Sequence, residues 1–237
     1  YSILYFPKIL YSKNLTPLCG IFDKLVINYK NEKFIIDIKK IDKEINETNT
    51  FGLIREIFVR NIHLKFFEID SLINKNCIDL GSNAGIFSLL AGKIFKKVVS
   101  IELQKKYKPV FENLMKENNL NNIHLLFGYV GDVADTQYLK VDEINKMKEE
   151  NQRIDINLLV EKYFGNRLDL LKMNIEGGEF KLFEELDFSK IESISMEVHH
   201  HAGDVSIIKE RLIKHNYEII TCDLDLEKTS INNKINH

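Results

Sequence analysis

Two short apolar runs within residues 76–102 each end in an acidic side chain, and a glycine-rich turn follows the first of them. The first run ends at Asp79 and leads into the turn GSNAG at 81–85, and the second run ends at Glu102. Glycine allows a backbone to approach a ligand closely. An acid about 20 residues beyond such a turn can accept hydrogen bonds from two ribose hydroxyls. The pattern is typical of a strand–turn–helix–strand unit that binds a nucleoside.

The composition of the turn narrows the choice of nucleoside. It has two glycines, Gly81 and Gly85, where a dinucleotide site needs three. The charge of Asp79 would repel a pyrophosphate and suits a cationic amine or sulfonium. This favours S-adenosylmethionine over a nicotinamide or flavin cofactor, and a structural turn without ligand is the remaining alternative. We expect the amino-acid part at the turn, the ribose on Glu102 and the adenine at the loop after the third strand. The residues expected to bind the cofactor are Asp79, Gly81, Ser82, Asn83, Ala84, Gly85, Glu102, Gly131, Asp132 and Asn174.

A second group of polar residues follows two later apolar runs. Alternation along SISMEVHHH places Glu197 and His199 on one face of a strand. Methyl transfer from a sulfonium needs a positioned acceptor and, for a weakly acidic hydroxyl, a general base. We expect His199 to be that base, Glu176 to lie in the acceptor pocket and Asn174 to line the transfer site. Simpler roles stay open: a surface histidine, a glutamate that complements a helix dipole, and an amide that forms a turn.

Carboxylate and imidazole groups are also ligands for divalent metals. Glu176, Glu197 and His199 would be the bridging set, but we expect no metal. The lysines at 105, 106 and 108 are expected to form a solvated helix face and not a phosphate site.

Strand patterns alternate with helical patterns from residue 76 onward, which predicts an α/β fold with a mostly parallel sheet and helices on both faces. In such sheets ligands bind outside the carboxyl ends of the strands. One strand is expected to end near Asp79, and others are expected to span 98–101, 123–127, 168–175, 193–198 and 217–222. Helices are expected to span 51–64, 86–95, 155–164 and 204–215, with further helices that begin at about residue 106 and after residue 179.

The first 50 residues have a different pattern. Apolar residues alternate on either side of Asn31-Glu32-Lys33, which predicts a β-hairpin, and the polar run 39–50 is expected to be a surface connection. We therefore expect a hairpin extension at 1–50 and a methyltransferase domain at 51–237. The extension would cover one end of the sheet, help form the acceptor pocket or make a homodimer contact. Residues 131–153 and the tail from Asp223 are expected to be loops.

Composition excludes several classes of protein. The 237 residues are 44% hydrophobic with a net charge of −2, which disfavours a basic nucleic-acid binder. No apolar run reaches the ~20 residues of a membrane span. Lysines interrupt the N-terminal apolar segment, so no signal peptide is expected. The three cysteines form no CxxC pair, which fits a reducing cytoplasm.

The segment Lys172–Glu179, with the sequence KMNIEGGE, resembles a motif of the FkbM family of class I S-adenosylmethionine-dependent methyltransferases. The stretches CIDLGSNAGIFSLL and MEVH extend this resemblance over about residues 76–222. It implies a Rossmann-like fold with a seven-stranded sheet and an antiparallel last strand. It also implies O-methylation, often of a sugar hydroxyl in a glycan, glycolipid or natural product, and hence a carbohydrate-containing or small-molecule acceptor.

The chain departs from the family pattern at two positions. Leu103 stands where the family usually has proline, and Asn174 stands where it usually has aspartate. An asparagine cannot be a base or a charged metal ligand, which shifts attention to Glu176 and the histidines. Two alternatives remain open: an RNA methyltransferase and a non-catalytic module that binds S-adenosylmethionine. Enzymes that methylate base nitrogens often have N-P-P-[YF] at this strand end, whereas Asn174 is followed by Ile-Glu-Gly-Gly.

Overall fold

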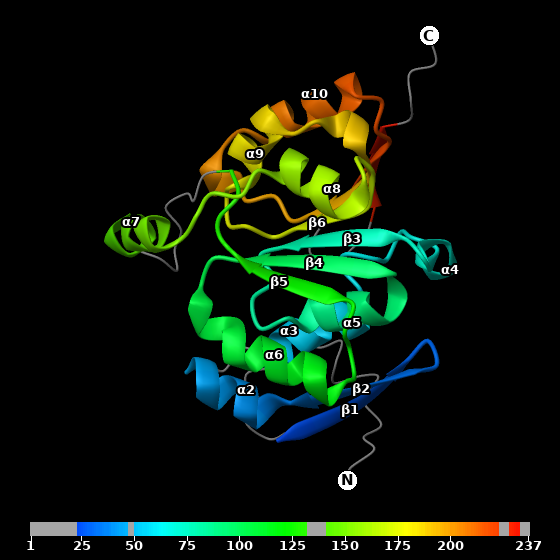
Figure 1. The fold of residues 1–237 in the computed structure, drawn as a ribbon. Coiled ribbons are helices and arrows are strands. Elements are labelled where there is room, and N and C mark those ends of the chain that lie inside the picture. Colours follow the sequence, from blue (N-terminus) through cyan, green and yellow to red (C-terminus); the bar gives the residue numbers. More distant parts are fainter. Residues whose placement is uncertain (1–22, 47–49, 132–140, 223–227, 233–237) are drawn as a thin grey trace. The chain divides into compact units, whose positions relative to one another are not determined.

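The computed structural model describes residues 23–46, 50–131, 141–222 and 228–232, and the chain divides into two compact units, 1–126 and 127–237. The expected α/β fold is confirmed (Figure 1). Strands β3 to β7 form a five-stranded parallel sheet, and the described residues form two further antiparallel pairs, β1–β2 and β8–β9. The strands are β1 Lys24–Tyr29, β2 Glu32–Asp37, β3 Asn76–Leu80, β4 Lys97–Glu102, β5 Ile123–Phe127, β6 Leu168–Met173, β7 Ile191–Met196, β8 Ile219–Cys222 and β9 Lys228–Asn232.

Helices in the first unit are α2 Ile38–Ile45, α3 Thr50–Ile54, the π-helical η2 Arg55–Arg60, α4 Ile69–Leu72, α5 Ile86–Ile94, the 3₁₀ turn η3 Lys105–Tyr107 and α6 Lys108–Glu117. Those in the second unit are α7 Val141–Glu150, α8 Ile156–Phe164, α9 Glu179–Glu185, the 3₁₀ turns η4 Phe188–Lys190 and η5 His200–Ala202, and α10 Val205–Lys214.

The expected N-terminal hairpin is present, with a shorter turn than predicted. Leu25 pairs with Ile36 and Ile27 with Phe34 across β1 and β2. The turn is Lys30-Asn31, and both residues have positive φ, 49° and 66°. Two-residue turns of this kind match the natural twist of paired strands. Glu32 and the residue after it therefore belong to β2, and the predicted loop at 31–33 was wrong.

Residues 39–45 of the polar run after the hairpin lie in helix α2, so the expected surface connection was wrong there. The Asp37 carboxylate accepts a hydrogen bond from the backbone N–H of Lys40 at 2.9 Å and caps α2. Three isoleucines at helical spacing then bury one face of α2. The apolar periodicity was present in the sequence, but the surrounding charges obscured it.

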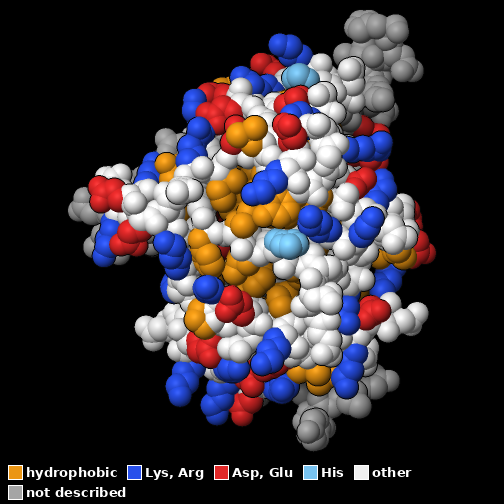
Figure 2. Space-filling view, in the orientation of Figure 1, with side chains coloured by type: hydrophobic (Ala, Val, Ile, Leu, Met, Phe, Trp, Pro, Cys, Tyr) orange, Lys and Arg blue, Asp and Glu red, His pale blue; other side chains and the backbone are white. Residues whose placement is uncertain are grey.

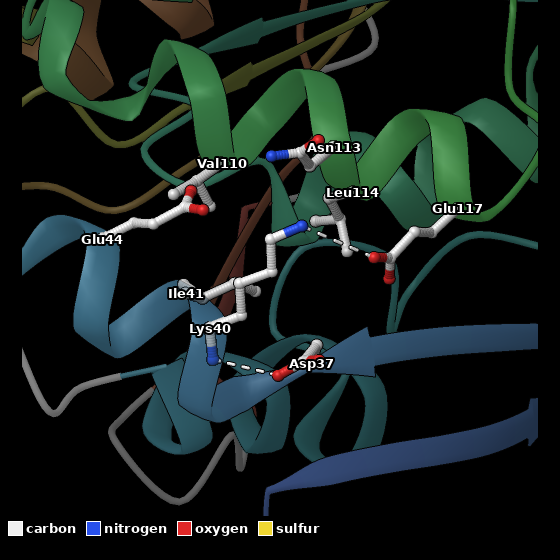
Figure 3. A pocket seen from close by; sticks show the side chains of 8 residues that line it. All are labelled: Asp37, Lys40, Ile41, Glu44, Val110, Asn113, Leu114 and Glu117. Atoms are coloured by element: carbon white, nitrogen blue, oxygen red, sulfur yellow. Dashed lines mark hydrogen bonds and ion pairs between the residues drawn. The ribbon is translucent and has the colours of Figure 1, made fainter.

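Helices α2 and α6 pack against each other, and α6 also packs against β2 (Figure 1). Between α2 and α6 lies a small hollow of about 10 Å³, where Lys40 Nζ approaches Glu117 Oε1 at 3.8 Å (Figure 3). A volume of this size holds about one water molecule. We assign this hollow to packing and not to ligand binding.

The nucleoside-binding unit is formed in the first unit by β3, α5 and β4, where β3 and β4 are parallel and pair Asp79 with Ser100. Every residue of β3 after Asn76 and of β4 after Lys97 is buried. Strands of a parallel sheet covered on both faces are mostly apolar, and the buried exceptions here are Asp79, Ser100 and Glu102. Helix α6 follows with a proline in its first turn, as expected.

In the second unit, β6 and β7 pair in parallel, and α10 packs against α9 and β8. Asp155 caps α8 as predicted, because its carboxylate accepts hydrogen bonds from the N–H groups of Asn157 and Leu158. Asp204 caps α10 in the same way through Ser206.

Three features of this unit differ from expectation. Helix α7 lies in the segment 131–153 that was expected to be a loop, and β9 lies in the tail. Among the described residues the parallel sheet has five strands and not seven, because β8 pairs with β9 in a separate antiparallel sheet. The division of the chain at residue 50 stays a prediction.

Across the residues that the structure describes, no helix is long and apolar enough to cross a membrane.

Asn118 connects the hairpin to the rest of the first unit, and its removal should lower stability. Its Oδ1 accepts a hydrogen bond from Ile35 N at 2.7 Å, and its Nδ2 donates to Ile35 O and Leu114 O, each at 2.8 Å. Asn118→Ala leaves the partly buried N–H and C=O of Ile35 without their partner, so we expect a loss of about 1–3 kcal/mol in the free energy of unfolding by urea titration. Asn121→Ala, at an exposed position, is the control and should change it by about 0.5 kcal/mol or less. Equal stabilities of the two variants would contradict this assignment.

Candidate active site

The glycine turn, residues 81–85, has the strained backbone that its sequence indicates. Gly81, Asn83 and Gly85 have φ of 71°, 50° and 89°. A Cβ on Gly85 would lie 2.6 Å from Phe111 Cδ2, so this position requires glycine in both conformation and space. The N–H groups of Gly81 and Ser82 donate to Ile101 O at 3.0 and 3.1 Å, which fixes the turn to β4.

Glu102 holds the other side of the glycine turn. Its Oε2 accepts a hydrogen bond from Asn83 N at 2.7 Å and its Oε1 accepts one from Gln104 N at 2.8 Å. Burial raises the pKa of the Glu102 carboxyl, and the N–H groups of Gln104 and Asn83 act against that rise. A carboxylate offers about four lone-pair positions. Glu102 can therefore hold the turn and still accept hydrogen bonds from ribose hydroxyls.

Asp79 lies wholly buried at the end of β3. Its Oδ2 accepts a hydrogen bond from Ser88 Oγ at 2.5 Å, and Ser88 Oγ lies 2.8 Å from Ser100 Oγ. Sequence analysis did not identify these two serines, although a buried carboxylate needs such donors. The contacts link β3, α5 and β4 directly behind the glycine turn.

The turn also contains a polar atom that suits a ligand. Ser82 is buried, and its Oγ has no hydrogen-bond partner among the described residues. Ala84 is wholly buried, and its N–H donates to Asn83 Oδ1 at 2.6 Å. A free hydroxyl beside a carboxylate with spare acceptor positions fits a polar, ribose-bearing cofactor such as S-adenosylmethionine.

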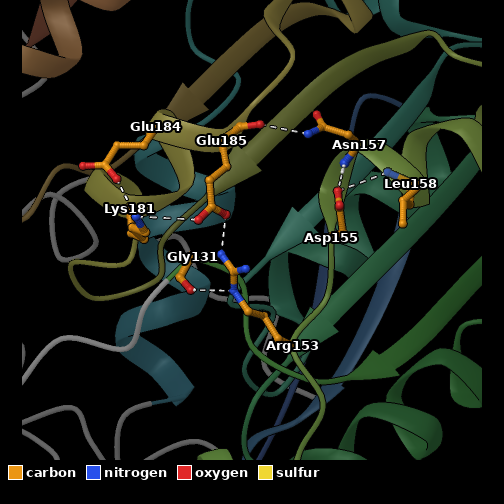
Figure 4. A network of polar contacts seen from close by, with 8 residues as sticks. All are labelled: Gly131, Arg153, Asp155, Asn157, Leu158, Lys181, Glu184 and Glu185. Atoms are coloured by element: carbon orange, nitrogen blue, oxygen red, sulfur yellow. Dashed lines mark hydrogen bonds and ion pairs between the residues drawn. The ribbon is translucent and has the colours of Figure 1, made fainter.

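Gly131, expected near the adenine, lies in the second unit and needs to be glycine. Its φ is 66°, and a Cβ there would lie 2.4 Å from Gly178 O. Arg153 Nε donates to Gly131 O at 3.2 Å, and the Arg153 guanidinium pairs with Glu185 (Figure 4). These residues border a hollow of about 230 Å³ in the second unit. Asp132, the other residue expected there, lies outside the described residues.

The strand-end cluster comprises Asn174, Glu176, Glu179, Glu197 and His199, all just beyond the ends of β6 and β7. Asn174 Nδ2 donates to Glu197 Oε2 at 3.0 Å, and Glu197 N donates to Met173 O at 3.1 Å. Glu176 has a positive φ of 53°, which is uncommon for a residue with a side chain. Backbone strain of this kind is concentrated at functional sites.

His199 is the centre of the strand-end cluster. Its Nδ1 lies 3.0 Å from Glu179 Oε1 and its Nε2 lies 3.3 Å from Glu176 Oε2. The hydrogen bond that His199 Nδ1 donates to Glu179 is the main cause that raises the pKa of His199, and burial acts in the opposite direction. Burial raises the pKa of Glu176, and the charge of His199 lowers it.

Strand alternation was expected to place Glu197 and His199 on one face, but the carboxylates that contact the imidazole are Glu179 and Glu176. Glu197 hydrogen-bonds to Asn174 instead. Because β7 ends at Met196, the strand alternation that was used to pair residues 197 and 199 does not apply. Glu179, to which the sequence analysis assigned no role, is wholly buried, and its position directly after the Glu-Gly-Gly turn was the available clue.

The described part of the chain contains no group of three His, Cys, Asp or Glu side chains placed to hold a metal ion. The carboxylates of the strand-end cluster instead contact the imidazole or an amide.

Comparison with known proteins identifies the family. Residues 79–219 match the family model described as methyltransferase FkbM domain. A protein of Fusobacterium nucleatum subsp. nucleatum, named as an uncharacterized RNA methyltransferase, is 26% identical over 202 residues, which is 84% of this chain and 39% of that protein. The chain thus spans well under half the length of this relative.

Solved structures give weaker similarities. A putative SAM-dependent methyltransferase from Streptococcus mutans has a TM-score of 0.44 at 12% identity, over 86% of this chain and 51% of that one. An rRNA methylase from Streptococcus thermophilus has a TM-score of 0.41 at 10% identity, over 66% and 82%. Similarities at this level do not distinguish one acceptor from another.

The Glu102 contacts lead to a prediction for cofactor binding. In Glu102→Gln, one acceptor oxygen becomes an amide that faces an N–H donor, so the turn loosens and a ribose contact is lost. We expect the dissociation constant for S-adenosylmethionine, measured by calorimetry, to rise at least tenfold, on the scale of one charged hydrogen bond. Glu112→Gln, at an exposed position on α6, is the matched control. Unchanged affinity in Glu102→Gln would show that Glu102 does not bind the ribose.

Proposed function

The chain belongs to the FkbM family of class I S-adenosylmethionine-dependent methyltransferases, and from this premise we propose that it methylates a hydroxyl of a carbohydrate-containing acceptor. The observation that carries the proposal is the environment of His199. Its side chain is 14% exposed, is bonded on the inner side to a wholly buried carboxylate, and meets the half-exposed Glu176 through Nε2. This is the arrangement expected of a general base.

S-adenosylmethionine supplies an electrophilic methyl group on a positively charged sulfur. His199 Nε2 accepts the proton of the acceptor hydroxyl while the hydroxyl oxygen forms its bond to the methyl carbon. The carbon–sulfur bond breaks in the same step, and its electron pair stays on sulfur. Positive charge passes to the imidazole, where Glu179 and Glu176 stabilise it.

The negative charge of the strand-end cluster favours a neutral, hydroxyl-rich acceptor over a polyanion. The strand-end cluster contains three carboxylates, those of Glu176, Glu179 and Glu197, around one imidazole. Such a cluster repels the phosphates of a nucleic acid, which binds to clustered Lys and Arg. On the face seen in Figure 2, basic and acidic side chains are intermingled. Carboxylate and amide oxygens are, in contrast, natural partners for sugar hydroxyls.

RNA methylation is the second candidate, because the Fusobacterium relative is named as an RNA methyltransferase. The identity of 26% and the coverage of 39% of that protein leave room for a different acceptor. The segment after Asn174, Ile-Glu-Gly-Gly, also lacks the N-P-P-[YF] pattern of many enzymes that methylate base nitrogens. The second observation disfavours methylation of a base nitrogen.

An acceptor screen tests the proposal. The purified chain is incubated with S-adenosylmethionine labelled in its methyl group and with separate glycan, glycolipid and RNA fractions of the source cells. We expect label in a glycan or glycolipid fraction and its loss in His199→Gln. Label in RNA alone would establish the second candidate. Binding of the cofactor without label in any fraction would support a non-catalytic module.

The rate should depend on pH through His199. Only the neutral imidazole can accept a proton, so activity should be low below the pKa of His199 and reach a plateau above it. Glu179, Glu176 and Glu197 raise this pKa, and the His201 ring lies 5.8 Å from the His199 ring. The rise in kcat should therefore lie above the ordinary histidine range. Its midpoint is read from a pH–rate profile, and a profile that is identical in His199→Gln would exclude His199 as the base.

A further inference from the structure

Glu179 is a buried carboxylate whose burial needs a reason. Its side chain is 0% exposed, although an unpaired buried charge costs several kcal/mol. Its Oε1 accepts a hydrogen bond from Ile175 N at 3.2 Å and lies 3.0 Å from His199 Nδ1. Its Oε2 has no hydrogen-bond partner among the described residues. An aspartate or a serine would be enough to accept one backbone N–H, so the imidazole contact is what distinguishes this glutamate.

The two carboxylates at His199 differ in mobility. Glu179 is fully buried and is held by the backbone of its own loop, whereas the Glu176 side chain is 42% exposed and lies 3.3 Å from Nε2. A solvent-exposed ion pair of this length contributes about 0–1 kcal/mol and exchanges readily. Nδ1 is therefore held by a fixed partner, and Nε2 faces a partner that an acceptor hydroxyl can replace.

We propose that Glu179 is a positioning residue that fixes the His199 imidazole with its proton on Nδ1 and its lone pair on Nε2. A carboxylate has no proton to donate, so Nδ1 must donate to the fixed Glu179, whereas the exposed Glu176 makes the same demand on Nε2 only until an acceptor hydroxyl replaces it. This selects the neutral tautomer that can accept a hydroxyl proton at Nε2, and it stabilises the imidazolium that forms. The catalytic consequence rests on the proposed function, but the orientation of the ring does not.

The orientation is tested directly on the wild-type protein by NMR. Long-range ¹H–¹⁵N spectra of the imidazoles distinguish Nδ1–H from Nε2–H, and the spectrum of His199→Gln assigns the His199 signals. Above its pKa, His199 should be held as the Nδ1–H tautomer, whereas the exposed His200 provides the reference for an unconstrained ring. An Nε2–H tautomer, or the same averaging as in His200, would overturn the proposal.

Glu179→Gln tests the role in catalysis. The glutamine amide can donate to Nδ1 and so favours the opposite tautomer, with the proton on Nε2. We expect kcat to fall on the order of 10²-fold or more, the pKa of His199 to fall because the main cause of its rise is removed, and KM and cofactor affinity to change less than about twofold. Glu184→Gln is the matched control, because it removes an exposed carboxylate from the same helix. A rate and pH profile like those of the control would overturn the role of Glu179.

Two further outcomes remain interpretable. If Glu179→Gln fails to fold, as judged by circular dichroism, the tautomer measured in the wild-type protein decides the proposal. If the Nδ1–H tautomer is found but no hydroxyl acceptor is methylated, the proposed function fails while the orientation of His199 by Glu179 is supported.

Discussion

A buried carboxylate must have hydrogen-bond donors, and this requirement determines the local structure at each strand end of the site. Glu102 meets it with the backbone N–H groups of Asn83 and Gln104, and thereby holds the glycine turn. Glu179 meets it with Ile175 N and the His199 imidazole. In both cases one glutamate holds the backbone in place and also provides or contacts the group that we propose to act, the Glu102 carboxylate or the His199 imidazole. The energetic cost of burial is the reason that these loops have one well-defined conformation.

The sequence predicted an element correctly where its cap or turn residues and its apolar periodicity indicated the same structure. Asp155 caps α8 as expected, and the glycine turn connects β3 to α5 as expected. Helix α2 was missed because its three buried isoleucines lie among charged residues, so composition suggested a surface loop. The pairing of β8 with β9 depends on contacts that no local pattern of these short strands specifies.

The sequence predicted which residues of the candidate site lie at strand ends, but it did not predict which of these side chains hydrogen-bond to one another. Asp79, Glu102, Glu176 and His199 all lie at strand ends, because the chain alternates strands and helices. The partner of His199 was not predictable in the same way, since Glu179 precedes it by 20 residues and meets it only after folding. The strand alternation that placed Glu197 on the same face as His199 does not apply, because β7 ends at Met196. Similarly, the contact of Ser88 with Asp79 connects a helix to a strand, and hydrophobic periodicity gives no information about such polar pairs.

The central claim is that the chain transfers a methyl group to a hydroxyl oxygen. The most direct test is ¹³C NMR of the product formed with S-adenosylmethionine that is ¹³C-labelled in the methyl group, because O-methyl and N-methyl carbons resonate in separate regions. The account predicts an O-methyl signal in the carbohydrate-containing product that is absent with His199→Gln. An N-methyl signal on a nucleobase, or an O-methyl signal that persists at full intensity in His199→Gln, would contradict it.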